Sequence, residues 1–122
     1  MLDTSCRTCQ RVGIVKGLAY NGLDAESNVV DRYMGVAVNI SQNGIQLETD
    51  RRINTEHILL MFYDFQSNYI SVRGKVVYSN KDASGMFKTG IQLLGKNGDN
   101  VDFVKRLIKS YHYQKKVPIF VT

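Results

Sequence analysis

Five residues in two short patterns carry side chains suited to binding a purine nucleotide. Arg7 and Arg11 lie near the N-terminus, and Asn39, Ser41 and Gly44 stand close together later in the chain. An arginine fork grips a phosphate with two hydrogen bonds, and its flat face stacks on a purine. Guanine offers acceptors to arginine on one edge and N–H donors to side-chain oxygens on the other. Together the patterns predict a site for a guanine-containing phosphate ligand, with Gly44 permitting a turn of positive φ beside it.

Each pattern alone has a simpler interpretation. Paired arginines are often solvated charges, and an Asn-x-Ser-x-x-Gly stretch is a common hairpin turn. The apolar residues around the second pattern, however, change from even to odd positions: Val36, Val38 and Ile40, then Ile45 and Leu47. Inward side chains alternate along a strand, so the change predicts a register break between Ile40 and Ile45 that re-aims Asn39 and Ser41.

The rest of the chain reads as several short strands separated by turns. One strand is expected to contain residues 12–20, and a second runs into the Asn39 pattern. A nearly continuous apolar run predicts a buried strand at 57–63, and alternation predicts strands at 70–79 and 87–93, with turns at 64–68 and 80–85. Short strands at such regular spacing are typical of a barrel or sandwich.

One helix is expected after the strands. From Asp99 the apolar period becomes helical, with Asp99 as the N-terminal cap and one apolar face: Val101, Val104, Ile108 and Tyr111. The expected organisation is a single domain: a flexible N-terminal arm over 1–11 that carries both arginines, a barrel over 12–95, a helix over 99–114 and a tail over 115–122.

The order of these segments resembles the PilZ domain, a small antiparallel β-barrel of the split-barrel type with a C-terminal helix. The likeness covers nearly the whole chain. It rests on an RxxxR motif, a [D/N]xSxxG motif and two strand segments: Arg7 and Arg11; Asn39, Ser41 and Gly44; Arg73-Gly74-Lys75-Val76-Val77-Tyr78; and Thr89-Gly90-Ile91-Gln92-Leu93. Two features depart from the family: a long polar link between the motifs, including residues 21–31, and Leu93 where an aromatic residue is common.

The resemblance implies a bacterial receptor for the second messenger cyclic di-GMP. In it, Arg7 and Arg11 would clamp guanine and phosphate from the arm, Asn39 and Ser41 would bind a guanine from the barrel surface, and Gly44 would shape the turn. Binding would change the conformation of the domain and pass a signal to an unidentified protein effector. The ligand is the only small molecule that the resemblance implies, with no cofactor beside it.

Catalytic and metal-binding motifs do not stand out in the sequence. It offers no Ser/His/Asp set, His-Glu-x-x-His or glycine-rich phosphate loop, so a binding module is expected rather than an enzyme. Cys6 and Cys9 form a Cys-x-x-Cys pair, but structural zinc needs four ligands, and only His57 and His112 remain as further histidine candidates. No metal site is expected, and two reduced thiols are the simplest interpretation of the pair.

The composition fits one compact cytoplasmic domain. With 122 residues and 43% hydrophobic content, the chain can bury a core without metal or disulfide bonds. No apolar run approaches the roughly 20 residues of a membrane span, and residues 1–10 lack the apolar stretch of a secretory signal. The net charge of +5 favours an anionic partner. Monomer and homodimer both remain open.

Two other functions are compatible with parts of the sequence. One is a small barrel that binds RNA or single-stranded DNA through basic and aromatic residues such as Tyr63, Phe65 and Tyr69. Most aromatic residues stand at positions suited to a core, which disfavours this alternative. The other is a protein-interaction adaptor of the same fold that no longer uses the nucleotide, and the intact motifs argue against it.

Overall fold

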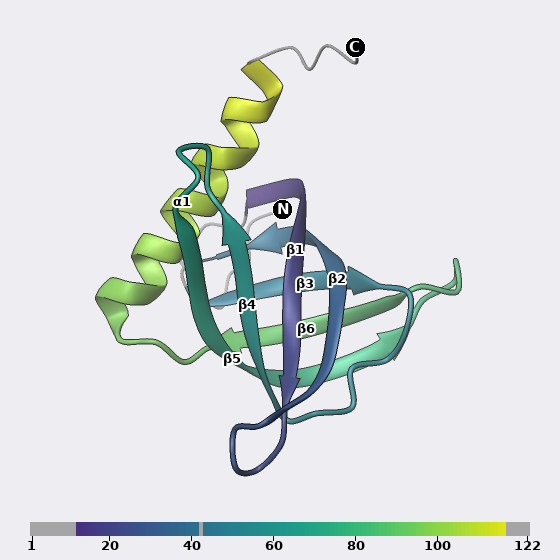
Figure 1. Cartoon of the computed structure of the whole chain (residues 1–122). Coiled ribbons are helices and arrows are strands. Elements are labelled where there is room, and N and C mark those ends of the chain that lie inside the picture. Colours follow the sequence, from purple (N-terminus) through teal and green to yellow (C-terminus); the bar gives the residue numbers. More distant parts are fainter. Residues whose placement is uncertain (1–11, 42, 117–122) are drawn as a thin grey trace.

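Six strands close into an antiparallel barrel, and one helix follows them. A computed structural model describes residues 12–41 and 43–116. The strands are β1 (Val12–Leu23), β2 (Val29–Ile40), β3 (Gly44–Thr49), β4 (His57–Tyr63), β5 (Tyr69–Lys81) and β6 (Phe87–Leu93), and the helix is α1 (Asn97–Lys116). The strands pair in the order β1-β2-β3-β6-β5-β4, and β4 returns to β1 (Figure 1). The expected β-barrel with a C-terminal helix is confirmed.

Three hairpin loops share one turn built on an aspartate. Asp24, Asp64 and Asp82 each accept hydrogen bonds from the backbone N–H groups two and four positions later, at 2.8 to 3.2 Å. The residue three positions after each aspartate has a positive φ: Ser27, Ser67 and Gly85. Side chains of aspartate commonly nucleate such turns. The turn expected at 64–68 is confirmed, whereas the one expected at 80–85 lies at 82–86, because β5 continues to Lys81.

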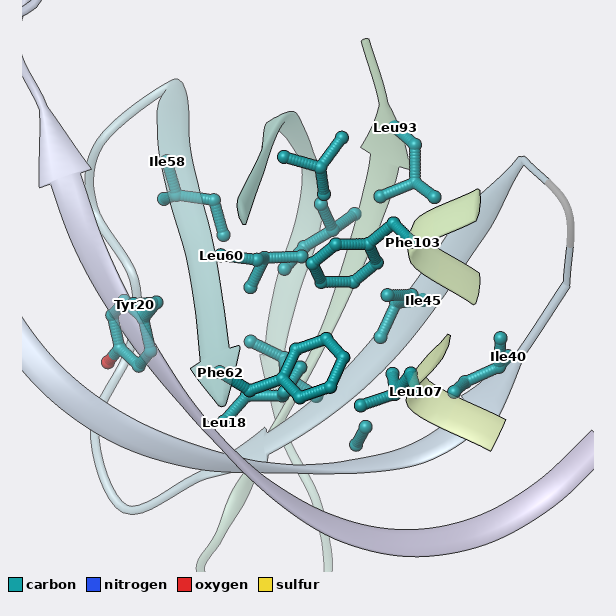
Figure 2. Close-up of a cluster of buried hydrophobic side chains, with 14 of the residues drawn as sticks. Leu18, Tyr20, Ile40, Ile45, Ile58, Leu60, Phe62, Leu93, Phe103 and Leu107 are labelled. Atoms are coloured by element: carbon teal, nitrogen blue, oxygen red, sulfur yellow. The ribbon is translucent and has the colours of Figure 1, made fainter. Parts of the chain in front are cut away.

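The core is formed by alternate side chains of all six strands and is closed at one end by α1. Leu18, Leu47 and Leu60 are completely buried inside the barrel, as is Leu107 from the helix. The rings of Phe62 and Phe103 meet edge to face with centroids 5.3 Å apart (Figure 2). Burying a side chain of this size stabilises the folded state by about 1.5 to 3 kcal/mol, so the residues that α1 adds to the core contribute to the free energy of unfolding.

Helix α1 is longer than the sequence pattern predicts. It begins at Asn97 and ends at Lys116, two residues beyond the expected end on each side. The N–H of Asn100 donates to the carbonyl of Lys96 at 2.9 Å, so Asp99 lies inside the first turn. The prediction that Asp99 caps the helix is therefore wrong. Its carboxylate still stands near the positive end of the helix dipole, where a negative charge is favourable.

The buried face of α1 also lies slightly to one side of the predicted face. It is centred on Phe103, Val104 and Leu107, which are buried, while Ile108 and Tyr111 are partly buried at its edge. These five residues cover the open end of the barrel with aliphatic and aromatic groups. The sequence pattern correctly placed Val104 on the buried face but missed Phe103 and Leu107.

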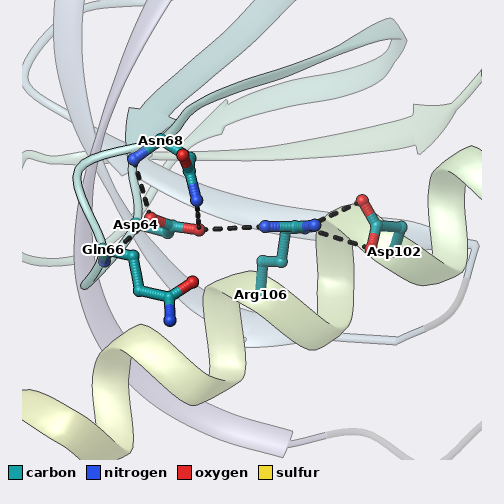
Figure 3. Close-up of polar contacts among 5 residues, drawn as sticks. All are labelled: Asp64, Gln66, Asn68, Asp102 and Arg106. Carbon is teal, nitrogen blue, oxygen red and sulfur yellow. Dashed lines mark hydrogen bonds and ion pairs between the residues drawn. The ribbon is translucent and has the colours of Figure 1, made fainter.

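Arg106 of α1 ties the helix to the hairpin between β4 and β5 (Figure 3). Its Nη1 donates to Oδ2 of Asp64 at 3.0 Å, and its Nε donates to Oδ2 of Asp102 at 2.9 Å. Burial disfavours the charge on Asp64, but hydrogen bonds from Asn68, Gln66 and Arg106 outweigh it and hold the pKa of the carboxyl below its ordinary value. The hydrogen bonds to ionised Asp64 therefore stabilise the fold at any pH above the pKa that Asp64 has in the unfolded chain. This stabilisation is lost as the pH falls through the lower pKa that Asp64 has in the folded chain.

Candidate functional site

A surface pocket lies where β2, β3, β6 and β5 run side by side. Its volume is about 410 Å³, and residues of both predicted strand segments and of the Asn39 pattern line it: Asn39, Ile40, Ser41, Asn43, Gly44, Ile45, Gln46, Val77, Tyr78, Gly90, Ile91 and Gln92. The structure thus brings together three of the predicted site residues, Asn39, Ser41 and Gly44. The other two, Arg7 and Arg11, lie outside the described residues, as do Cys6 and Cys9.

One row of outward positions crosses all four strands at the pocket. Asn39 pairs with Gln46, Gln46 with Gly90, and Gly90 with Tyr78. Within this row Nδ2 of Asn39 donates to Oε1 of Gln46 at 3.0 Å, and Nε2 of Gln46 donates to the hydroxyl of Tyr78 at 2.9 Å. The chain of hydrogen bonds fixes the amide of Asn39, because its N–H group faces Gln46 and its carbonyl oxygen is left to accept from a ligand.

Gly90 lets the ring of Tyr78 lie across β6. A Cβ atom at position 90 would stand 2.2 Å from the nearest ring carbon of Tyr78, closer than any real contact. With only hydrogen there, the ring passes over the backbone and its hydroxyl reaches Gln46 on the strand beyond. Glycine is therefore required for this close approach and for the wall that Tyr78 forms beside the pocket.

A β-bulge in β2 turns Asn39 toward the pocket. The register with β3 shifts between Ala37 and Asn39, which leaves Val38 as the extra residue. Gly35 and Ala37 are buried before the bulge, and Ile40 is buried after it. Without the extra residue Asn39 would continue the buried series, so the bulge moves its side chain from the barrel interior to the outer surface.

The register break expected between Ile40 and Ile45 is therefore misplaced. These two residues are direct partners across the β2–β3 hairpin, and both point inward. The parity change between them is the ordinary result of a hairpin, whereas the true break is at Val38. The prediction that Val36 and Val38 face the core is wrong for the same reason, since both are only partly buried.

A second bulge, in β5, acts on Tyr78 in the same way. The register with β6 shifts between Val76 and Tyr78, with Val77 as the extra residue. Gly74 is buried before the bulge and Ser79 after it, so Tyr78 points outward. Two one-residue insertions in strands far apart in the sequence therefore place the two ends of the hydrogen-bonded row on one surface.

The hairpin from Ser41 to Gly44 forms the end of the pocket. The backbone N–H of Ser41 donates to the carbonyl of Gly44 at 2.8 Å, and its hydroxyl lies 3.4 Å from the same oxygen. Gly44 does not have a positive φ, which corrects the prediction of a left-handed turn there. Its role is close approach to β6, because a Cβ atom would stand 3.0 Å from the carbonyl oxygen of Ile91.

Among the described residues, the pocket lining carries no formal charge. All twelve of these lining residues are neutral, and amide and hydroxyl groups provide their polar atoms. Lys88 lies beyond the pocket and forms ion pairs with Glu48 at 3.4 Å and with Asp82 at 3.5 Å. Such a lining can read hydrogen bonds on a base, but any phosphate would require cations from another part of the chain.

Gln46, Tyr78 and Gly90 belong to the site but were not predicted as site residues. Tyr78 and Gly90 lie in the two strand segments that carried the family resemblance, so a signal for them existed in the sequence. Gln46 had none, because its role depends on neighbours from β2 and β5 that only the barrel brings together. Among the described residues, no group of three or more His, Cys, Asp or Glu could hold a metal ion.

The PilZ domain family matches residues 7–111, and the chain belongs to this family. PilZ domains bind c-di-GMP and are generally non-catalytic receptors for it. No curated protein sequence matches the chain. Within the part of the chain that the structure describes, no helix has the length and apolar character needed to cross a membrane.

Solved structures with the same fold support the architecture. Inhibitor of motility (MotI/DgrA) of Bacillus subtilis is 15% identical, with a TM-score of 0.62 over 89% of this chain and 53% of its own. The PilZ domain of YcgR from Escherichia coli, solved with c-di-GMP, is 10% identical, with a TM-score of 0.56 over 90% of this chain and 94% of its own. The MrkH–c-di-GMP complex of K. pneumonia is 13% identical, with a TM-score of 0.58 over 90% and 53%. The chain spans about half the length of MotI and of MrkH.

The close approach at Gly90 yields a first prediction. Gly90→Ala should displace the ring of Tyr78 and break its hydrogen bond to Gln46, while the free energy of unfolding falls by no more than about 1 kcal/mol, because Tyr78 is a surface side chain. NMR shifts of the Tyr78 ring and urea unfolding measure the two effects. Gly17→Ala is the matched control, since a Cβ atom there meets nothing within 4 Å. An unmoved Tyr78 ring in the variant would contradict the assignment.

Proposed function

We propose that this chain is a cyclic di-GMP receptor whose site combines the described pocket with the two arginines that precede β1. Asn39 and Ser41 bind a guanine, Gly44 brings their hairpin against β6, and Arg7 and Arg11 supply the charge for the phosphates. The proposed function is binding and signalling, without catalysis and without a metal or cofactor.

One observation of the backbone carries the proposal. Val12 pairs with Ile40 and Gly13 pairs with Asn39, at the start of β1. Arg11 therefore directly precedes a residue that lies opposite the Asn39–Gly44 motif, although the two motifs are far apart in the sequence. We infer that Arg11 reaches a ligand in the pocket from this place in the sequence, because the described lining is neutral and leaves the phosphates in need of a cation.

The geometry of the row suits a guanine. The carbonyl oxygen of Asn39 accepts from N–H donors of the base, and the hydrogen bond to Gln46 holds that oxygen in place. The ring of Tyr78 offers a flat face beside the same pocket, and aromatic faces stack well on purines. Adenine lacks the paired N–H donors of guanine, so this arrangement favours cyclic di-GMP over its adenine analogue.

Loss of the arginine clamp is the most direct test. Arg7→Ala and Arg11→Ala should each weaken cyclic di-GMP binding by more than about 2 kcal/mol, because each removes a charge-assisted contact. Titration calorimetry measures the affinity, with GTP and single-stranded RNA as competing ligands. Arg51→Ala is the matched control, since Arg51 hydrogen-bonds to Tyr33 and does not line the pocket. Unchanged affinity in both arginine variants would refute the clamp.

Base selectivity tests the barrel side of the site. Asn39→Ala and Ser41→Ala should each cost about 1 to 3 kcal/mol of binding and should reduce discrimination against cyclic di-AMP, because hydrogen bonds to guanine are lost. Asn80→Ala, an exposed residue of β5 outside the pocket, should leave both quantities unchanged. Equal affinity of the wild-type chain for cyclic di-GMP and cyclic di-AMP would show that guanine is not read.

The conformational part of the proposal concerns the segment that joins the arginines to β1. A ligand held by both motifs ties residues 5–13 to the barrel and presents a new surface to a protein effector. Hydrogen exchange of the backbone amides of residues 5–13 should therefore slow when cyclic di-GMP is added to saturation. Exchange at equal rates with and without the ligand would mean that this segment is not the switch.

A further inference from the structure

An apolar surface covers the outer side of the four strands β2, β1, β4 and β5, away from the pocket lining. Met34 pairs with Ala19, Ala19 with Met61, and Met61 with Ser71, so these side chains form one row across the barrel. Met34 is 66% exposed, although it is a large apolar side chain. We call the surface formed by Ala19, Met34, Leu59, Met61, Tyr63 and Tyr69 the outer face.

Two tyrosines extend the outer face beside this row. Tyr63 and Tyr69 are direct cross-strand partners, their ring centroids lie 5.7 Å apart, and they are 67% and 54% exposed. Near them, the exposed rings of Phe65 and Tyr113 lie 5.1 Å apart. These four aromatic residues are therefore outside the core, whereas the sequence led us to expect that most aromatic residues of the chain stand at core positions. Exposed apolar groups gathered in this way mark interaction sites in soluble proteins.

Two arginines border one edge of the outer face, and Asp99 and Asp102 of α1 line a hollow beside one of them, Arg73. The neighbouring row runs from Arg32 through Asn21 and Leu59 to Arg73. Arg73 donates to the hydroxyl of Ser27, and neither arginine forms an ion pair with a described carboxylate. At the outward positions of these four strands that the structure describes, no residue is Asp or Glu.

Helix α1 and the β1–β2 loop adjoin this surface at one edge, where Asp99 and Asp102 line a hollow with Leu59 and Arg73, and Ser27 accepts from Arg73. In Figure 1, β4, β1 and β2 lie at the front of the barrel, while α1 lies to the upper left. Gly17, two residues before Ala19 on β1, pairs with Val36 and has open space where a Cβ atom would point. The centre of the outer face is therefore low, with Gly17 and Ala19 between the larger side chains of Met34, Met61 and Tyr63.

We propose that the outer face docks a protein partner that presents an apolar centre with carboxylates along one side of it. Interface centres are enriched in tyrosine, methionine and arginine and depleted in acidic residues, which is the composition found here. Methionine adapts its shape to varied partners. Arg32 and Arg73, which form no ion pair with a described carboxylate, select acidic groups along this edge.

Other occupants fit the outer face less well. A symmetric dimer through this face would gather the arginines of both copies in one interface, with no carboxylate at the described outward positions of these strands to pair with them. Single-stranded nucleic acid needs a groove of cations that follows its phosphates, and here two arginines border one side of a centre that contains Ala19, Met34 and Met61. The outer face shares no residue with the pocket lining, so the proposal holds whether or not the pocket binds a nucleotide.

A peptide selection tests the proposal with the full chain. A phage-displayed library of random peptides is selected on the wild-type protein, and bound peptides are synthesised and titrated. We expect selected peptides to combine aromatic or aliphatic residues with Asp or Glu. Their affinity should fall at least about tenfold for Met34→Ser, for Tyr63→Ser and for the double variant Arg32→Glu, Arg73→Glu. Circular dichroism establishes that each variant is folded.

Controls separate the outer face from general stickiness and from other occupants. Val77→Ser removes an apolar side chain of similar exposure, 63%, at the pocket and should bind the peptides as the wild type does. Selected peptides that are basic, or that bind all variants equally, would overturn the proposal. The proposal would also be overturned if the chain formed a dimer in sedimentation velocity, or bound poly-uridine or anionic phosphatidylglycerol vesicles, and if Met34→Ser and Tyr63→Ser abolished that association.

Discussion

The two-residue period of a β-strand is the constraint on which this structure depends. Once a strand lies in the barrel wall, every second side chain is committed to the core, and only an inserted residue can change which ones. Val38 and Val77 are such residues. Each marks a boundary along its strand: Met34 and Tyr69, before the inserted residues, belong to the outer face, whereas Asn39 and Tyr78, directly after them, line the pocket. Two surfaces of different chemistry are thereby carried on the same two strands, β2 and β5.

The pocket separates recognition of shape and hydrogen bonding from recognition of charge. Its amides, hydroxyl groups and tyrosine ring are held by one another across rigid strands, through the bonds from Asn39 to Gln46 and from Gln46 to Tyr78. Preorganised groups of this kind lose little entropy on binding, since their rotamers are already fixed. In the proposed receptor, the positive charge comes from Arg7 and Arg11, which precede β1 in the sequence. This division would let one part of the site define the ligand and the other respond to it.

Local patterns predicted the elements of the fold well, because strands and turns are encoded by neighbouring residues. The bounds of β4 and β6 agree with the apolar run at His57–Tyr63 and the alternation at Phe87–Leu93, but the prediction that β4 is a buried strand is wrong, since only every second residue of it is buried. The bulge at Val38 was not visible, since an extra residue is recognised only against the partner strand. Gln46 was missed for the same reason. Asp99 was misread as a cap because the chain before it enters the helix earlier than the apolar period begins. For the site, a sequence motif predicted Asn39, Ser41 and Gly44 as binding residues. The row of residues that orients Asn39 could not be predicted in this way, because its members come from different hairpins.

Closure of the barrel determines how any partner is recognised. Each of the six strands has a neighbour on both sides for part of its length, in the cycle that β4 and β1 complete. An open sheet can accept an extra strand from another molecule, whose main chain then provides most of the affinity with little regard to sequence. A closed wall offers few such edges. Recognition here must therefore be carried by side chains, so the binding properties of related chains can diverge through substitution of outward residues while the hydrogen-bonded wall stays the same.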